Sequence, residues 1–108
     1  EFISNTTPIP ANKPKLTMVH AVAAELMGMR FIYLEAGSGA DVPVPVEHIA
    51  LTRKATDLTI ITGGGLTTPE MANLRAQAGA QIIVTGTTIE KNASATLVRE
   101  FADAIHHA

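Results

Sequence analysis

Three apolar segments of the chain, each followed at once by small residues, set its organisation. Each is rich in β-branched or aromatic residues and has the length of one buried strand. The strands are expected over 30–34, 58–62 and 81–85, and they lead into Gly37-Ser38-Gly39, Gly63-Gly64-Gly65 and Gly86-Thr87. These turns recur about every 25 residues, close to the length of one strand–helix unit in a (β/α)8 barrel of about 250 residues.

Segments with helical periodicity separate the strands. Apolar residues at three- and four-residue intervals predict helices over 17–27, 45–55, 69–78 and 94–105. Thr68-Pro69-Glu70 is the clearest helix start, because it combines a hydroxyl cap, a proline and an acid near the positive helix end. Before the first helix, the prolines among residues 1–15 favour an extended loop or linker, with Phe2-Ile3-Ser4 as the end of a strand.

The repeated order of strand and helix predicts an α/β fold with parallel strands and right-handed crossovers. Three such units over 16–108, plus the end of one more strand, do not close a parallel sheet, and parallel sheets are normally covered on both faces. We therefore expect residues 1–108 to be the C-terminal portion of a single (β/α)8 TIM-barrel domain. The alternative is a small open α/β domain that stands alone.

Composition narrows the class of partner. The net charge of −2, from 8 basic and 10 acidic residues, offers no basic field, so we expect no nucleic-acid partner. The absence of cysteine excludes disulfides and thiolate metal sites, and the four histidines lack the spacing of metal ligands. No apolar run approaches the roughly 18 residues of a membrane span, and no signal peptide is recognisable, so we expect a cytoplasmic protein.

The glycine turns all follow strands, and in parallel α/β proteins ligands bind at the carboxyl ends of strands. Glycine lets backbone N–H groups approach an oxyanion closely, and a following helix N-terminus adds positive potential. The turns contain no lysine or arginine, so the ligands for an anion would be amides and the hydroxyls of Ser38, Thr62 and Thr87. The turns after the last two strands occupy the position of the phosphate site of many barrel enzymes. The alternative is that these glycines only permit tight turns.

Glu35 is the most informative single residue. Because side chains alternate along a strand, Tyr33 and Glu35 point to the same face, either the barrel lumen or the helix layer. A carboxylate in a lumen is costly unless it has a partner or a task. The expected task is to accept a hydrogen bond from a substrate hydroxyl, or to act as general base. The alternative is an ion pair with a basic residue elsewhere in the barrel.

Three segments of the sequence resemble one known family, the geranylgeranylglyceryl phosphate synthases of archaea and their bacterial heptaprenyl relatives. The segments are Tyr33-Leu34-Glu35-Ala36-Gly37-Ser38-Gly39-Ala40, Gly63-Gly64-Gly65-Leu66-Thr67-Thr68-Pro69-Glu70 and Val84-Thr85-Gly86-Thr87-Thr88-Ile89-Glu90. The first is nearly diagnostic, whereas the other two are common to phosphate-binding barrels. The similarity extends over nearly the whole chain from about Thr17, and it implies strands 6–8 of the barrel with their helices plus the end of strand 5.

The resemblance implies a Mg²⁺-dependent prenyltransferase that joins a long allylic diphosphate, geranylgeranyl diphosphate, to sn-glycerol 1-phosphate. It implies that Tyr33 and Glu35 hold the glycerol hydroxyls, with Glu35 as base, and that the glycine turns bind the phosphate. The implied substrate-binding residues are Tyr33, Leu34, Glu35, Ala36, Gly37, Ser38, Gly39, Gly63, Gly64, Gly65, Gly86 and Thr87. The aspartate that helps the family bind Mg²⁺ has no match here, so the Mg²⁺ ligands are expected in an N-terminal half-barrel segment. A homo-oligomer is also expected.

Two other functions fit the residues. A sugar-phosphate isomerase or epimerase would share the glycine turns, although it has no need of Tyr33 and Glu35 before Gly37-Ser38-Gly39. A non-catalytic half-barrel would bind phosphate or serve only as an assembly partner.

Overall fold

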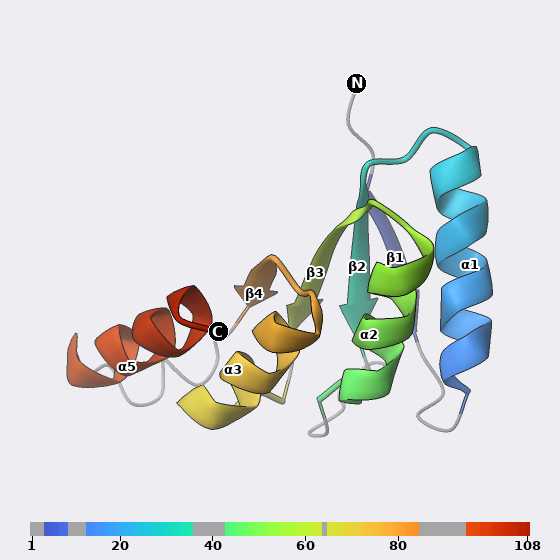
Figure 1. Cartoon of the computed structure of the whole chain (residues 1–108). Coiled ribbons are helices and arrows are strands. Elements are labelled where there is room, and N and C mark those ends of the chain that lie inside the picture. Colours follow the sequence, from blue (N-terminus) through green and yellow to red (C-terminus); the bar gives the residue numbers. More distant parts are fainter. Residues whose placement is uncertain (1–3, 9–12, 36–42, 64, 85–94) are drawn as a thin grey trace.

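The computed structural model describes residues 4–8, 13–35, 43–63, 65–84 and 95–108. Its centre is a parallel four-stranded sheet with the strand order β1-β2-β3-β4 (Figure 1). The strands are β1 (Ser4–Pro8), β2 (Phe31–Glu35), β3 (Thr59–Gly63) and β4 (Ile82–Val84). Strands that are neighbours in sequence are therefore neighbours in the sheet, as in a barrel wall.

Helices connect the strands and form the second layer of the fold. They are α1 (Pro14–Leu26), α2 (Val46–Ala55), α3 (Pro69–Ala78) and α5 (Ala95–His106). Each helix contacts the next one, α1 with α2, α2 with α3, and α3 with α5 (Figure 1). This arrangement confirms the predicted α/β fold with parallel strands.

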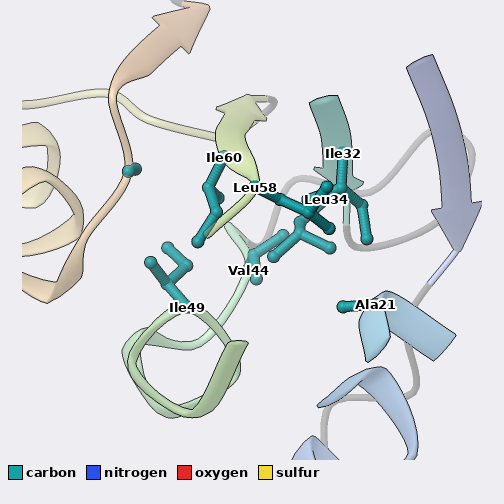
Figure 2. Packing of buried hydrophobic residues seen from close by; sticks show 8 residues of the cluster. Ala21, Ile32, Leu34, Val44, Ile49, Leu58 and Ile60 are labelled. Atoms are coloured by element: carbon teal, nitrogen blue, oxygen red, sulfur yellow. The ribbon is translucent and has the colours of Figure 1, made fainter. Parts of the chain in front are cut away.

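The hydrophobic core lies between the sheet and the helices. Ile32 and Leu34 on β2 and Ile60 on β3 point toward Ala21 of α1 and Ile49 of α2 (Figure 2). The core cluster is completed by Val44, Leu58 and Ala80. Full burial of an isoleucine or leucine side chain contributes about 1.5–3 kcal/mol, so these few aliphatic residues account for much of the packing energy.

The first fifteen residues contain a strand, as the expected strand end indicated, but it extends to Pro8 into the expected loop. Ser4–Pro8 pairs with β2 from Ser4 opposite Phe31 to Pro8 opposite Glu35. Proline ends this strand, where its missing N–H costs least. Pro14 does not block helix formation either, because it occupies the first turn of α1, where no intrahelical partner is needed. Within the described residues, β1 and α1 thus form a strand–helix pair before the three units expected over 16–108.

The orientation of α1 does not follow its largest apolar side chains. Small residues face the core, whereas Leu26 and Met27 are 83% and 71% exposed. The buried residues of α1 are Thr17, Ala21 and Ala24. Apolar periodicity alone does not predict this orientation, because close approach to α2 favours small side chains over large ones.

The helix-distal face of the sheet is less covered than the core face. Along β2, buried Ile32 and Leu34 alternate with half-buried Phe31, Tyr33 and Glu35. Ile82 and Val84 of β4 are 45% and 42% exposed. Within the described residues, β1 and β4 are the edge strands, each paired on one side. None of the helices described is long and apolar enough to cross a membrane.

Candidate functional site

Tyr33 and Glu35 lie on the face of the sheet that points away from the helices. Their neighbours Ile32 and Leu34 are in the core, so the alternation of the strand turns Tyr33 and Glu35 to the opposite side. Glu35 is the last residue of β2, at the carboxyl end of the sheet. The alternative of a carboxylate buried in the helix layer is thereby excluded.

The side chain of Tyr33 reaches the end of the next strand, where Gly63 leaves room for the phenol. A Cβ atom at Gly63 would lie 2.8 Å from Tyr33 Oη and 2.7 Å from Val84 Cβ. Contacts this short essentially do not occur between a real Cβ and its neighbours, so the phenol occupies space that only glycine leaves open. Gly63 is paired with Val84 in the register of β3 and β4. The phenol of β2 thus reaches across β3 toward β4.

The environment of Tyr33 favours the neutral form of its phenol. Burial raises the pKa of Tyr33 above its usual value of 10.0, and the negative charge of Glu35 raises this pKa further. Tyr33 and Glu35 are two residues apart on the same face of β2, which places the carboxylate near the phenol. A neutral phenol both donates and accepts a hydrogen bond, whereas an ionised carboxylate only accepts. The pair therefore offers complementary hydrogen-bonding groups to a polyol.

Thr62 is a structural residue rather than an anion ligand. Its hydroxyl donates a hydrogen bond of 3.1 Å to the backbone oxygen of Leu34 and is buried. The expectation that this hydroxyl would help bind an anion is wrong, because it points toward the helix layer. The hydrogen bond instead joins the ends of β2 and β3, the two strands that carry Glu35 and Gly63.

The turn after β3 leads into a well-capped helix. Gly65 has a φ of +72°, a left-handed conformation that favours glycine. The Thr68 hydroxyl accepts a hydrogen bond of 3.3 Å from Met71 N, and Pro69 begins the helix, as predicted. The residues of α3 that end it, Ala78 and the C-cap Gly79, also agree with the prediction.

Several predicted site residues lie outside the described residues. These are Ala36, Gly37, Ser38, Gly39, Gly64, Gly86 and Thr87. The strands that lead to all three predicted turns are described, and their register places Glu35, Gly63 and Val84 at one rim of the sheet. The described part of the chain contains no group of three His, Cys, Asp or Glu residues able to hold a metal ion.

Sequence reasoning missed one polar residue near this rim. Arg75 of α3 is only 8% exposed, and its guanidinium donates hydrogen bonds to the backbone oxygen of Val44, just before α2. The signal available in the sequence was weak, since one arginine in a helix that also contains Glu70 and Gln77 is typical of a solvated face. Only the orientation of α3 against α2 shows that Arg75 is buried.

The histidines are not part of the site. His20 is exposed, and His48 is buried between α1 and α2, where its Nδ1 lies 2.8 Å from Thr17 Oγ1. His48 therefore belongs to the packing of two helices. His106 and His107 are exposed at the end of the chain.

Comparison with known proteins adds an independent line of evidence. The sequence model of the PcrB family matches residues 2–105. The geranylgeranylglyceryl phosphate synthase of Korarchaeum cryptofilum is 50% identical over 105 residues, which cover 96% of this chain and 43% of that protein. The synthase of the same name from Thermococcus gammatolerans is 50% identical over 99 residues, covering 92% of this chain and 39% of that protein.

Two solved structures have the same arrangement of elements. The (S)-3-O-geranylgeranylglyceryl phosphate synthase of Thermoplasma acidophilum, solved in complex with its substrate sn-glycerol-1-phosphate, matches with a TM-score of 0.81 at 33% identity. The corresponding enzyme of Thermoplasma volcanium matches with a TM-score of 0.82 at 35% identity. Each match covers 93% of this chain and 41% of the other chain, so this chain spans about two fifths of the length of its relatives.

Proposed function

This chain belongs to the PcrB family, and we propose that it supplies the glycerol phosphate site of a geranylgeranylglyceryl phosphate synthase. The substrates would be geranylgeranyl diphosphate, a long-chain allylic diphosphate, and sn-glycerol 1-phosphate. The observation that carries the proposal is the placement of Tyr33, Glu35 and Gly63 at one rim of the sheet face that lies away from the helices. It is supported by the relative from Thermoplasma acidophilum that was solved with sn-glycerol-1-phosphate.

Glu35 is the proposed base for the acceptor alcohol. The primary hydroxyl of glycerol phosphate donates a hydrogen bond to the Glu35 carboxylate and attacks C1 of the prenyl group. A C–O ether bond forms, the C–O bond to diphosphate breaks, and the bonding electrons leave with the diphosphate. The hydroxyl proton passes to Glu35. Holding the alcohol at this position replaces a bimolecular encounter with an oriented one.

Tyr33 is the proposed partner of a second glycerol hydroxyl. A phenol carries its proton at neutral pH, and burial and Glu35 raise the pKa of Tyr33 further above 10.0, so it is available as a hydrogen-bond donor. Gly63 holds open the space in which the phenol lies. Tyr33 would therefore set the orientation of the acceptor, and Glu35 would carry out the proton transfer.

Backbone amides are the proposed ligands of the acceptor phosphate. They would come from the turn after β2 with Ser38 and Gly39, from Gly64 and Gly65 after β3, and from Gly86 and Thr87 after β4. The capped N-terminus of α3 supports this assignment, because it follows the second of these turns and adds positive potential to the same rim.

The described residues do not fit a Mg²⁺ site of their own. They contain no cluster of three potential ligands, and their carboxylate at this rim, Glu35, is assigned to the acceptor hydroxyl. We propose that the Mg²⁺ ligands lie outside this chain, where the ion would offset the charge of the leaving diphosphate. No step assigned to Tyr33 or Glu35 depends on it.

Two apolar surfaces support assembly with further protein. The helix-distal sheet face carries Ile82 and Val84, and we propose that this face is the lumen wall of a (β/α)8 barrel whose first strands come from an N-terminal half-barrel segment. Strands β1 to β4 would then be strands 5 to 8. A second surface on α1 exposes Leu16, Val19 and Leu26, and we assign it to the contact between subunits of a homo-oligomer.

The proposal is tested by prenyl transfer in the assembled enzyme, measured with radiolabelled sn-glycerol 1-phosphate and geranylgeranyl diphosphate. Formation of a lipid-extractable labelled ether is the expected result, and added EDTA should abolish it. Isomerisation of a sugar phosphate without ether formation would replace the proposal with the isomerase alternative. Phosphate binding without either activity would favour a non-catalytic half-barrel.

A further inference from the structure

Arg75 is a buried cation whose hydrogen bonds, within the described part of the chain, all go to backbone carbonyls. Its Nε and Nη2 donate to the oxygen of Val44 at 3.2 and 3.0 Å, and its Nη1 donates to the oxygen of Met71 at 3.3 Å. Burial lowers the pKa of the guanidinium, which shows that placing the charge here has a cost. A surface arginine at this point of the helix would avoid that cost.

The target of these hydrogen bonds is a fixed point of the backbone. The Val44 side chain is buried in the core cluster, where it lies between α2 and the strands (Figure 2). The next residue, Pro45, is the N-cap of α2 with φ −60° and ψ 143°, and a proline restricts the residue before it to extended backbone. Core packing, Pro45 and Arg75 therefore fix Val44 together.

Val44 and Arg75 belong to the two connections that matter most for the proposed site. Val44 lies at the end of the connection that leaves β2 after Glu35. Arg75 lies on α3, the helix that follows the turn after Gly63. The guanidinium thus joins the end of one connection to the helix that follows the other. A shift of α3 relative to α2 would change the distance between Val44 and the N-terminus of α3.

We propose that Arg75 is a positioning residue for the acceptor site, which fixes the start of α2 at Val44 against α3 and thereby sets the affinity for the phosphate of the acceptor. The inference rests on the function proposed above, since that function places the phosphate at the turns after β2 and β3. Arg75 itself touches neither substrate. It acts through Val44, by holding the backbone that enters α2 against α3.

Arginine is needed at this position because one carbonyl accepts from two nitrogen atoms of the same rigid fork. A lysine ammonium is a single point donor on a flexible stem, so it would retain the charge but lose the fixed geometry. The Arg75→Lys variant therefore tests the role of the fixed hydrogen-bond geometry while the positive charge is retained. Arg75→Met, which retains most of the aliphatic stem, removes both.

The matched control is Arg53 at the other end of the sheet. Its Nη2 donates to the oxygen of Leu58 at 2.6 Å and to the oxygen of Gly79 at 3.3 Å. It therefore also joins α2 to neighbouring elements through backbone carbonyls, but at the amino ends of β3 and β4. Arg53→Lys should reduce the melting temperature without changing either Michaelis constant.

The experiment compares these variants in the assembled enzyme. In Arg75→Lys and Arg75→Met we expect the KM for sn-glycerol 1-phosphate to rise about tenfold, as for a site displaced by a fraction of an ångström, with kcat and the KM for prenyl diphosphate within about twofold. The Kd for sn-glycerol 1-phosphate, measured by calorimetry, should rise in parallel with KM.

An unchanged KM and Kd in Arg75→Lys would overturn the inference, and so would an equal rise in the Arg53 variants. A parallel increase in the KM values of both substrates would indicate a general loss of structure and would also overturn it. The calorimetric arm keeps the inference separate from the proposed function. If the parent enzyme binds sn-glycerol 1-phosphate but forms no ether, the proposed function fails while the role of Arg75 in binding is still decided by Kd.

Discussion

The two ends of the sheet use their polar groups differently. At the amino end, Arg53 donates to the backbone oxygens of Leu58 and Gly79 and to Gln81 Oε1, and the same Gln81 oxygen accepts from Ile60 N at 3.2 Å. Glu25 at the end of α1 accepts from Asp57 N at 2.6 Å. Each of these polar groups has a partner within the fold.

At the carboxyl end, Thr62 and Arg75 have partners within the fold, but Tyr33 and Glu35 lie on the sheet face away from the helices. Within the described residues, the side chains of Tyr33 and Glu35 have no hydrogen-bond partner, although they interact through charge. Gly63 contributes space rather than a contact. The comparison indicates that the amino end stabilises the fold, whereas the carboxyl end retains hydrogen-bonding capacity for a ligand, as in barrel enzymes generally.

The largest expected effect comes from Glu35→Gln at the carboxyl end. The amide keeps the size of the side chain but cannot accept a proton at neutral pH, so turnover should fall about 100-fold or more, within the usual range for a general base. The Kd for sn-glycerol 1-phosphate should change far less, and the melting temperature should not fall. Steady-state kinetics, calorimetry and thermal melting measure the three quantities. Parent-like turnover would remove Glu35 from the role of base.

Gly63→Ala should have the next largest effect, because the new Cβ needs the space of the phenol. Gly63 does not have a positive φ, so the cost comes from contacts with Tyr33 and Val84 rather than from backbone strain. Overpacking of this kind costs about 1–3 kcal/mol, and displacement of the phenol should also raise the KM for sn-glycerol 1-phosphate. Denaturant unfolding and kinetics measure the two effects.

Gly28→Ala is the control for this substitution. Gly28 follows α1 at the amino end of the sheet, has a φ of +90°, and has no atom within 4 Å of the position of a Cβ. Alanine there should reduce stability through backbone strain alone and leave the KM unchanged. A similar rise in KM for both glycine variants would contradict the division between the two ends.

The sequence predicted the strands and helices better than it predicted their environments. The repeated apolar segments placed β2, β3 and β4 within a residue or two, and the capping residues Thr68 and Gly79 placed both ends of α3, because these signals are local. For β1, only a strand end at Phe2-Ile3-Ser4 was predicted, and its extension to Pro8 was missed, since a proline-rich stretch becomes a strand only by pairing with β2. The pairing partner lies more than twenty residues away and leaves no local signal.

The candidate site was predictable to a similar extent. The alternation of β2 placed Tyr33 and Glu35 on one face, but only the buried positions of Ile32 and Leu34 show which face it is. Thr62 was misassigned because its hydroxyl is used by Leu34 on the helix side. Arg75 was missed because burial of a helical arginine depends on the neighbouring helix, which composition does not describe.

Arg53→Met tests the amino end directly. The substitution keeps the stem beside Gly79 and removes the donors for the carbonyl oxygens of Leu58 and Gly79. Because these hydrogen bonds are only partly buried, we expect the free energy of unfolding to fall by about 1–2 kcal/mol, with no change in either KM. Denaturant unfolding of the assembled enzyme measures the loss. A change in KM without a loss of stability would reverse the assignment of the two ends.

Tyr33→Phe should have the smallest effect and sharpens the comparison at the carboxyl end. Loss of one neutral hydroxyl is expected to raise the KM for sn-glycerol 1-phosphate about fivefold, the equivalent of about 1 kcal/mol. The raised pKa of Tyr33 gives a second readout, because the folded protein retains the phenolic proton at a pH where the unfolded chain has released it. This contribution to stability is complete below pH 10.0 and is lost as the pH rises through the folded-state pKa. The melting temperature of the parent should therefore fall more steeply above that pH than that of Tyr33→Phe, and identical alkaline profiles would show that Glu35 and burial do not act on this phenol.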